Sequence, residues 1–572
     1  MDKRDIARIL KETSFFLLLR GDDFHKARTY HNAGTALLAS PLDAAELVHS
    51  GRLVQVKGIG PATASVITDL VRTGVSPYHQ EVRGSYPSSL MELGDVPGLR
   101  TKQIKQLFDH AGIRSIAELQ AACRKDDLLS IPGFGPKLQA KLSSALGEYQ
   151  RGRGYVLYAD AVEEAVALGT ALENLDRVGD VCLAGAMRRR LEVVNELIFV
   201  ARCTHSRPLP YMAAALKGIP NVTDVARRSD AVTAVSPRGM PLTVVAATPK
   251  DYGLSLLQAT GNDEHLHGLR QRLAERGFRD WDTVKTRMAG LGEAEITRAA
   301  GLPFIPPELR EGQDDLDGAV TDRIPLLVET SRIQGFFHTH TNYSDGSGTV
   351  EEMVLAAKNA GFRYLGISDH SQSAFYANGL KEARIRTQWA EIDMVRKKHP
   401  DCHIFKGIEA DILPDGSMDY PDALLAEFDF VIASVHSRFN LSEEDQTRRI
   451  CRALANPYVT MLGHPTGRLL LSRPGYRVDL SRVIAAAAVH RKMIEINGSR
   501  HRLDLDWRWV RAARAEGVTF CVNPDAHAVD EVANVALGVN VARKAALTAG
   551  DIVNTLGLAD ILARLSSTTQ SG

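Results

Sequence analysis

The chain has 572 residues, in which 69 Lys plus Arg balance 69 Asp plus Glu, and 44% of the residues are hydrophobic. This length is too great for one hydrophobic core and predicts about three or four domains. A net charge of zero excludes bulk electrostatic attraction as the basis of nucleic-acid or membrane binding. Any such binding must come from local patches or backbone amides.

The six cysteines are scattered and form no CxxC pair, which argues against a zinc ribbon or a disulfide framework. The N-terminal sequence MDKRDIARIL is typical of an amphipathic helix and lacks the apolar core of a signal peptide. No run approaches the ~18 uninterrupted apolar residues of a membrane span. These features predict a reducing, cytoplasmic location.

Residues 1–150 are predicted to be helical, because apolar residues recur at three- and four-residue spacing between short Gly-rich turns. Three segments, 56–62, 96–102 and 131–137, repeat one pattern of apolar residue, Gly turn and helix start. Glycines let the backbone approach a phosphate, and a helix N-terminus presents free amides to it. One such turn is common between packed helices, but three favour nucleic-acid binding. The candidate contacts are Gly58, Gly60, Gly98, Lys102, Gly133, Gly135 and Lys137.

These segments resemble helix-hairpin-helix motifs, which grip the DNA backbone without reading bases. Lys102 and Lys137 lie in the first helical turn, where a cation opposes the helix dipole, so phosphate contact explains their position best. The second copy departs from the pattern, with Arg100 in place of the second Gly. The resemblance implies a DNA-binding domain at 1–90 and a fingers-like one at 91–150.

Strand-like runs appear at 193–200 and 242–246. The segment 182–200 resembles the nucleotidyltransferase signature of X-family DNA polymerases, in which a Gly-Ser turn and two arginines hold the incoming triphosphate. The resemblance implies a palm at 151–250 and a thumb at 251–312. The matching nucleotide-binding positions, which are degenerate, are Gly185, Arg188, Arg189 and Glu196.

Three substitutions set this palm apart from the family. Ala186 replaces the Ser of the turn, while Ile198 and Pro241 occupy two of the three metal-binding Asp positions. Ile and Pro side chains cannot coordinate Mg²⁺. We therefore expect the polymerase site to be impaired and its binding of Mg²⁺ or Mn²⁺ to be weakened. A weaker manganese-dependent reaction supported by Glu192 and Glu196 stays open.

After a linker at 313–332, residues 333–572 alternate short apolar runs with helical stretches such as 350–360 and 480–490. This alternation implies a parallel sheet, and seven repeats indicate a closed or nearly closed barrel. The predicted strands are 333–337, 364–368, 403–408, 429–435, 459–463, 493–497 and 518–523.

Six of the seven runs carry a His, Asp or Glu at or near the end, where barrel enzymes place their functional side chains. An HxH on an extended segment points both imidazoles to one side. Mixed His and carboxylate sets suit zinc, manganese or iron in catalytic sites, and so many donors fit about two or three ions. Asp369 is expected to orient a ligand or cap a helix, and the sixth run, MIEING, offers no ligand. The candidate metal ligands and catalytic residues are His338, His340, Asp345, His370, Glu409, His436, His464, Asp525 and His527.

Residues 333–572 resemble the PHP (polymerase and histidinol phosphatase) domain, a distorted seven-stranded barrel with a three-metal site. The order of segments resembles that of bacterial X-family DNA polymerases over nearly the whole chain. This implies a multidomain fold with N-terminal all-α helix-hairpin-helix domains, an α+β nucleotidyltransferase palm and thumb, and a C-terminal α/β distorted (β/α)7 PHP barrel.

The resemblance implies a DNA-repair protein whose barrel, with Mn²⁺ or Zn²⁺, is a phosphodiesterase, in particular a manganese-dependent 3′→5′ exonuclease. We expect a monomer, associated with the nucleoid, that binds gapped, nicked or 3′-ended DNA but no membrane. A dNTP is a second candidate ligand. Two alternatives stay open: an active gap-filling polymerase with the barrel as an editing nuclease, and a non-catalytic DNA-binding platform.

Overall fold

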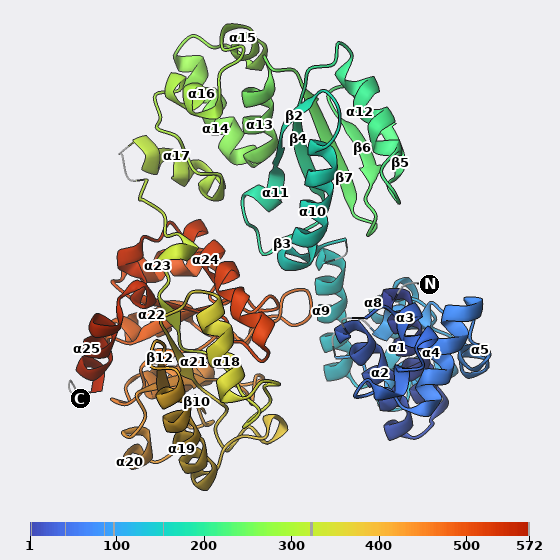
Figure 1. The fold of residues 1–572 in the computed structure, drawn as a ribbon, viewed down its shortest axis with the longest axis vertical. Helices are drawn as coiled ribbons and strands as arrows, with labels where there is room; N and C mark the ends of the chain where they lie inside the picture. The colour runs from blue at the N-terminus through green and yellow to red at the C-terminus, as the bar shows by residue number, and fades with distance from the viewer. Residues whose placement is uncertain are drawn as a thin grey trace. The chain divides into compact units, whose positions relative to one another are not determined.

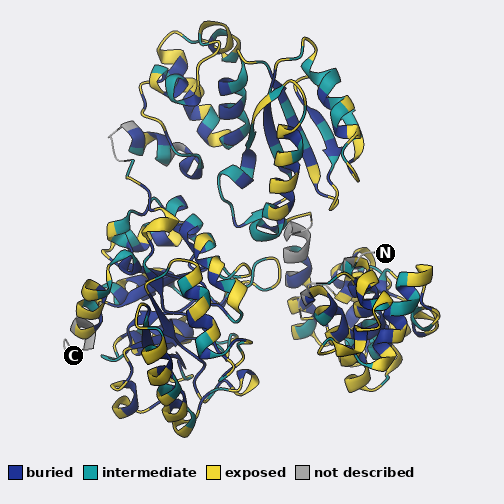
Figure 2. Ribbon diagram, in the orientation of Figure 1, coloured by how far each residue is buried: buried dark blue, intermediate teal, exposed yellow. Residues whose placement is uncertain are grey.

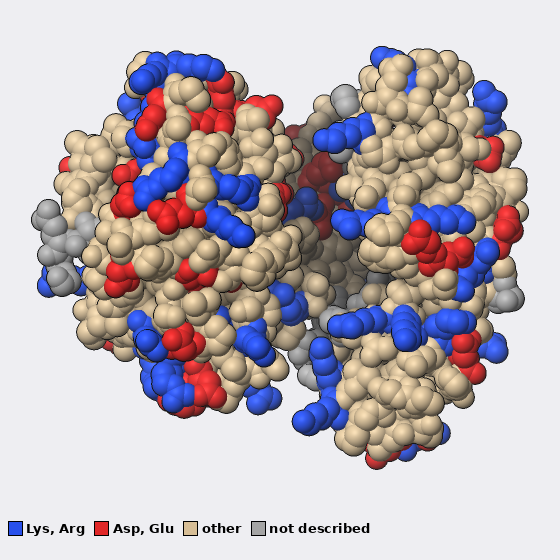
Figure 3. Space-filling model, turned by 90° about the horizontal axis from the view of Figure 1, so that it is seen from below, with Lys and Arg blue, Asp and Glu red and all other residues tan. Residues whose placement is uncertain are grey.

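The computed structural model describes residues 1, 3–40, 42–84, 86–94, 96, 98–152, 154–320 and 324–569. The chain divides into two compact units, residues 1–153 and residues 154–572 (Figure 1). None of the helices in these described ranges has the length and apolar character needed to cross a lipid bilayer. On the face seen in Figure 3, basic side chains are spread among acidic ones, in keeping with a net charge of zero.

The first unit is helical throughout its described part, as the apolar spacing predicts. Its helices pack around one core to which α1 contributes the fully buried Ile6, Leu10 and Leu17. The elements are α1 (Lys3–Arg20), α2 (Phe24–Ala39), α3 (Ala44–His49), η1 (Leu53–Gln55), α4 (Pro61–Thr73), α5 (Pro77–Arg83), α6 (Leu90–Gly94), α7 (Thr101–Ala111), α8 (Ile116–Arg124), η2 (Asp127–Ser130) and α9 (Pro136–Gly152).

The second unit begins with a five-stranded sheet in the order β2-β4-β7-β6-β5, in which only β4 and β7 are parallel. Helices α10 and α12 cover one face of this sheet and α13 packs on the other. The elements are β1 (Val156–Leu157), α10 (Tyr158–Glu173), β2 (Val178–Leu183), α11 (Gly185–Arg188), β3 (Val193–Val194), β4 (Leu197–Cys203), α12 (Pro208–Lys217), β5 (Thr223–Arg227), β6 (Val232–Val235), β7 (Pro241–Ala247) and α13 (Tyr252–Thr260).

A helical segment follows, comprising α14 (Asp263–Glu275), α15 (Trp281–Arg287), α16 (Glu293–Ala299), η3 (Pro307–Leu309) and α17 (Gln313–Val320). Within the expected linker at 313–332, residues 313–320 form helix α17. Leu316 and Ala319, three residues apart, are buried in the same cluster as Leu269 of α14. This apolar pair gives the acidic segment one face to bury, while residues 321–323 lie outside the described part of the chain.

The remainder forms the predicted barrel of seven parallel strands in the order β14-β13-β12-β11-β10-β9-β8. The first and last strands meet through a parallel bridge between Thr339 and Ala526, and the Phe337 amide donates to Asn523 Oδ1 at 2.9 Å. The strands are β8 (Gly335–Phe336), β9 (Tyr364–Ile367), β10 (His403–Asp411), β11 (Phe430–Ser434), β12 (Met461–Leu462), β13 (Met493–Asn497) and β14 (Phe520–Asn523).

Helices surround these strands, as Figure 1 shows in yellow to red. They are α18 (Val350–Asn359), α19 (Glu382–Lys398), α20 (Asp422–Leu425), α21 (Glu443–Leu454), α22 (Leu480–Val489), α23 (Trp507–Ala515), α24 (Val535–Lys544) and α25 (Leu558–Thr569). Short 3₁₀ turns complete the barrel: η4 (Thr330–Arg332), η5 (Phe375–Ala377), η6 (Val529–Asn534), η7 (Ala549–Asp551) and η8 (Val553–Thr555).

The barrel interior changes from apolar to polar along the strands, all of which are buried (dark blue in Figure 2). Near the strand starts, Phe337, Tyr364, Phe405 and Phe430 belong to one buried cluster. Two residues after Tyr364 and Phe405, Gly366 and Gly407 leave room for the Phe430 ring. The inward positions beyond them are polar and fully buried, and comprise Ser368, Glu409, Ser434, Glu495 and Asn523. Because every second side chain of a strand points into the barrel, these polar side chains lie inside it at the carboxyl ends of the strands.

Candidate metal centre

The structure brings all nine predicted ligand residues together at the carboxyl-terminal rim of the barrel. They form four overlapping groups, and within each group the donor atoms lie within 4.8 Å of one another. The groups are His340, Asp345, His370 and His527; His338, His464 and Asp525; His338, His340 and Glu409; and His370, Glu409 and His436.

Two carboxylates lie at the centre of this cluster. Glu409 Oε1 is 2.8 Å from His464 Nε2, and Glu409 Oε2 is 2.9 Å from His370 Nδ1. Asp525 Oδ1 is 3.3 Å from His340 Nε2 and 3.4 Å from His338 Nε2. With their other contacts, Glu409 lies within 4 Å of five imidazoles and Asp525 of three, an arrangement suited to sharing between neighbouring ions.

Several donor atoms of the cluster are buried without a hydrogen-bond partner. These are His338 Nε2, both ring nitrogens of His340, His370 Nδ1, Glu409 Oε2 and His464 Nδ1. Buried polar atoms are normally satisfied, so an unpaired set pointing to one place is costly unless a ligand completes it. The donor atoms, whose lone pairs are free, suit divalent cations such as zinc or manganese.

Electrostatics within the cluster are those of imidazoles and carboxylates in close contact. Burial disfavours ionised Glu409 and Asp525, but the surrounding imidazoles outweigh it and hold both pKa values well below the ordinary range. Burial also opposes protonation of His436, yet Glu409 and Asp411 prevail and raise its pKa to about 10. Burial and the His527 and His370 rings keep the pKa of His340 well below 6.5. Both carboxylates therefore stay ionised and available to a cation.

Two carboxylates that the sequence did not single out orient ligands. Glu495, inside the run MIEING, accepts a hydrogen bond from His338 Nδ1 at 2.7 Å, and Asp411 lies 2.6 Å from His436 Nδ1. Such contacts fix the tautomer that leaves Nε2 free for a metal. The sequence signal that could have identified Glu495 was a Glu within a continuous apolar strand, because a buried charge requires a partner.

Asp369 lies beside the cluster but belongs to none of its four groups. Its carboxylate accepts the backbone amides of Thr341 at 2.8 Å and Ser344 at 3.1 Å, and Gln388 Nε2 at 2.6 Å. These bonds hold the loop between His340 and Asp345. The geometry is that of an orienting residue, as expected from the sequence.

The predicted nucleotide-binding residues of the palm make contacts with other residues of this chain. Ile198 is half-buried on β4, and a Cβ placed on Gly185 would lie 2.8 Å from its Cδ1. Arg188 makes two bonds to Glu293, with Nη1 to Oε1 at 2.9 Å and Nη2 to Oε2 at 2.7 Å. Arg189 Nε donates to Glu311 Oε1 at 3.0 Å. The two arginines that the resemblance assigns to a triphosphate are therefore paired with carboxylates of this chain.

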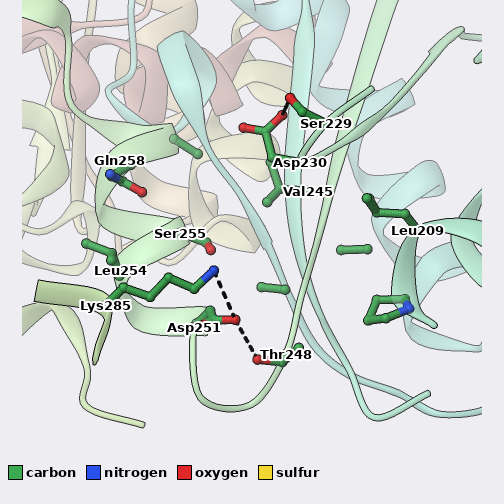
Figure 4. Close-up of a pocket in the computed structure, with 14 residues that line it drawn as sticks. Leu209, Ser229, Asp230, Val245, Thr248, Asp251, Leu254, Ser255, Gln258 and Lys285 are labelled. Atoms are coloured by element: carbon green, nitrogen blue, oxygen red, sulfur yellow. Dashed lines mark hydrogen bonds and ion pairs between the residues drawn. The ribbon is translucent and has the colours of Figure 1, made fainter. Parts of the chain in front are cut away.

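A pocket of about 490 Å³ lies at the far end of the same sheet, beside α13 (Figure 4). Lys285 Nζ points toward Asp251 at 3.7 Å, and Thr248 Oγ1 donates to that carboxylate at 2.7 Å. Val245 and Leu254 supply apolar lining. The second carboxylate of the pocket, Asp230, accepts from Ser229 Oγ at 3.2 Å. With both carboxylates already engaged, this pocket does not replace the missing palm ligands.

The three hairpin turns of the first unit share one backbone geometry. Gly58, Gly98 and Gly133 have positive φ angles of 101°, 81° and 88°, which favour glycine. A helix begins three residues after each of these glycines: α4, α7 and α9 respectively. Lys102 and Lys137 are exposed in the first turns of α7 and α9. Pro97, in the second motif, lies outside the described residues.

Helical hairpins, a five-stranded sheet and a seven-stranded barrel with a polar rim are the architecture expected of the X-family DNA polymerase family whose members carry a PHP domain. Family models agree: "Helix-hairpin-helix domain" matches residues 1–76, "SAM-like Helix-hairpin-helix tandem" 90–148 and "PHP domain" 337–519. The chain is 33% identical over 580 residues to "DNA polymerase/3'-5' exonuclease PolX" of Bacillus subtilis (strain 168), covering 99% of both chains. It belongs to this PolX family.

Other relatives match about a third of the chain. A "Probable phosphatase" of Caldicellulosiruptor saccharolyticus is 30% identical over 205 residues, 34% of this chain and 81% of its own length. A "Probable phosphatase" of Acetivibrio thermocellus is 28% identical over 207 residues, 34% of this chain and 80% of its own length. The matched segment makes up most of each of these relatives.

Proposed function

We propose that the barrel is a metal-dependent phosphodiesterase, a manganese-dependent 3′→5′ exonuclease that acts on DNA ends or gaps, and that the polymerase site is impaired. The observation that carries the proposal is the convergence of nine donor residues with buried, unpaired ligand atoms. The name of the Bacillus subtilis relative supports the nuclease activity. The neutralised Arg188 and Arg189 support the loss of polymerase function.

We propose the nine rim residues as ligands of two or three Mn²⁺ or Zn²⁺ ions. Bound ions would supply the Lewis acidity and the activation of water that phosphodiester hydrolysis needs. The protein's part is to hold its donors in place: Glu495 and Asp411 fix the His338 and His436 rings, and Asp369 fixes the 341–345 loop. Arg502, whose Nε is 3.3 Å from Asp525 Oδ2, adds positive charge beside the centre.

We further propose that the N-terminal hairpins hold the DNA backbone through their glycine turns and through Lys102 and Lys137. The domain bounds that accompany this proposal are 1–90, 91–150, 151–250, 251–312 and 333–572, with α17 added to the thumb. We expect the protein to act as a monomer, in the cytoplasm and with the nucleoid.

The test is incubation of a 3′-recessed primer–template with Mn²⁺ or Mg²⁺, with and without dNTPs. Primer shortening is expected with Mn²⁺, and His338→Ala or Asp525→Ala should abolish it by removing central donors. His490→Ala, an exposed histidine at the opposite end of the barrel, is the matched control and should keep full activity.

Extension that survives His338→Ala but is lost in Glu196→Ala would instead favour a gap-filling polymerase with an editing barrel. DNA retention without shortening or extension would favour a non-catalytic binding platform. Either result contradicts the proposed function.

A further inference from the structure

Two aromatic rings stand exposed beside the metal centre. Phe375 is 85% and Tyr376 71% exposed, and both lie on η5, five and six residues after the candidate ligand His370. Large exposed rings next to each other are unusual on a protein surface and often mark a binding site.

The loop that carries the rings is held firmly. The Leu380 amide donates to His370 O at 2.8 Å, and the Ser373 amide donates to Asp419 Oδ2 at 2.7 Å. A Cβ on Gly379 would lie 1.9 Å from Ser371 O, so the chain closes tightly on itself. The exposure of Phe375 and Tyr376 is therefore a property of an ordered loop.

Tyr376 faces the centre. Its ring centroid lies 6.2 Å from that of His370. Partial desolvation, together with the Glu409, Asp411 and Asp345 carboxylates, raises the pKa of Tyr376, which places the phenol within their field.

Two arginines, Arg473 and Arg502, lie on the loops that follow β12 and β13, at the same end of the barrel as the centre. Arg502 Nε is 3.3 Å from Asp525 Oδ2. Arg473 Nη2 donates to Gly467 O at 2.7 Å, and its guanidinium lies 4.6 Å from the centre of the Phe439 ring. Burial and Arg502 lower the pKa of Arg473, and Tyr376 opposes this shift. Arg502 and Tyr376 thus each lie beside a candidate metal ligand, Asp525 and His370 respectively.

We propose that Phe375 and Tyr376 form a stacking platform for an unpaired nucleobase at the end of a DNA strand, while Arg473 and Arg502 contact its phosphates. The inference rests on the proposed function and names the residues that seat its substrate. Rings combined with cations beside a phosphoesterase centre match the stacking surfaces and basic grooves that bind single strands. An apolar protein partner would not require the two guanidinium groups.

Steady-state hydrolysis of a single-stranded oligonucleotide with Mn²⁺ tests the platform. Phe375→Ala and Tyr376→Ala should each raise KM about tenfold, the effect of losing one base–aromatic contact, with kcat changed less than about twofold. Tyr376→Phe keeps the ring and should behave as wild type. Val489→Ala, an apolar residue 76% exposed at the end of α22, is the control. Loss of activity in Tyr376→Phe, or an unchanged KM in both alanine variants, would overturn the proposal.

A binding measurement separates this proposal from the proposed function. An oligonucleotide with a 3′-terminal 2-aminopurine should lose fluorescence on mixing with the protein, before any hydrolysis, because the base stacks. Quenching lost in Phe375→Ala and Tyr376→Ala but kept in Val489→Ala supports the platform even if no variant cleaves DNA. Quenching unchanged in the alanine variants overturns it and would point to docking of a protein segment on the rings.

Discussion

Glu495 shows how one residue can determine the chemistry of its neighbours. Its carboxylate accepts four hydrogen bonds, including His338 Nδ1 at 2.7 Å, the His464 amide at 2.7 Å and Asn523 Nδ2 at 3.0 Å. Burial opposes its ionisation, but the His338 ring outweighs it and lowers the pKa of Glu495. Only an ionised carboxylate accepts from all four donors.

Glu495→Gln should weaken metal binding about 10- to 100-fold. The amide NH₂ is itself a hydrogen-bond donor and cannot accept from the groups around it, so the His338 ring would no longer be held in one tautomer. Titration with Mn²⁺ followed by electron paramagnetic resonance measures this. Glu516→Gln, exposed at the end of α23, is the matched control. Equal affinity in both variants would contradict the orienting role.

Lys492 carries a buried charge away from the metal centre. It is 5% exposed, Nζ donates to Pro457 O at 3.1 Å, and burial lowers its pKa from 10.5 to about 8. Between these two values the unfolded chain binds more protons than the folded one, so the free energy of unfolding due to Lys492 rises with pH. Below pH 8 the charged form is destabilising.

Lys492→Met should therefore raise the free energy of unfolding by about 2 kcal/mol at pH 7, with the gain vanishing above the ordinary lysine pKa. Chemical denaturation between pH 7 and 11 measures it, with the exposed Lys397→Met as control. A gain that is constant over this range would assign the effect to packing instead of charge.

At the scale of elements, the Phe430 ring determines how strands β9, β10 and β11 pack. A Cβ on Gly366 or Gly407 would lie 2.4 Å or 2.0 Å from Phe430 Cζ, so Phe430 fills the space that these glycines leave. The glycines in two neighbouring strands are thus packing residues, although isolated glycines usually weaken strands.

Gly407→Ala should lower the free energy of unfolding by about 2 kcal/mol through overpacking. Phe430→Leu in the same chain should restore part of the loss by vacating the space. Thermal or urea unfolding measures both, with Gly557→Ala, which meets nothing within 4 Å, as control. Strictly additive losses in the double variant would show that the two positions do not interact.

Elements differ in how well the sequence predicted them. The seven strands of the barrel appear where short apolar runs alternate with helical stretches, because a strand buried on both faces must be apolar. Helix α17 was missed, since its acidic composition hides a single apolar face. That face, Leu316 and Ala319, becomes significant only when α14 lies against it.

For the whole molecule, stability should depend on metal in one unit only. All nine candidate ligands belong to residues 154–572 and none to residues 1–153. Ions that bind the folded state stabilise it by mass action, by about 2.7 kcal/mol at a hundred times Kd.

Scanning calorimetry of the full chain should show the transition of residues 154–572 rising by about 2–5 °C in Mn²⁺ relative to EDTA. The transition of the first unit should not move. The Asp525→Ala protein should lose the response. A shift shared equally by both transitions would contradict a site confined to the barrel.

The sequence by itself determined the barrel, the helical hairpins and the nine donors at the strand ends, because strand period and chain order already place those side chains on one rim. Only the tertiary structure decided which groups orient them, as with Glu495 and Asp411, and which rim loops meet. Ser373 and Asp419 are 46 positions apart and belong to loops after different strands, yet the Ser373 amide donates to Asp419 Oδ2 at 2.7 Å. Closure of the barrel brings such loops to one opening, and no local pattern encodes that distance.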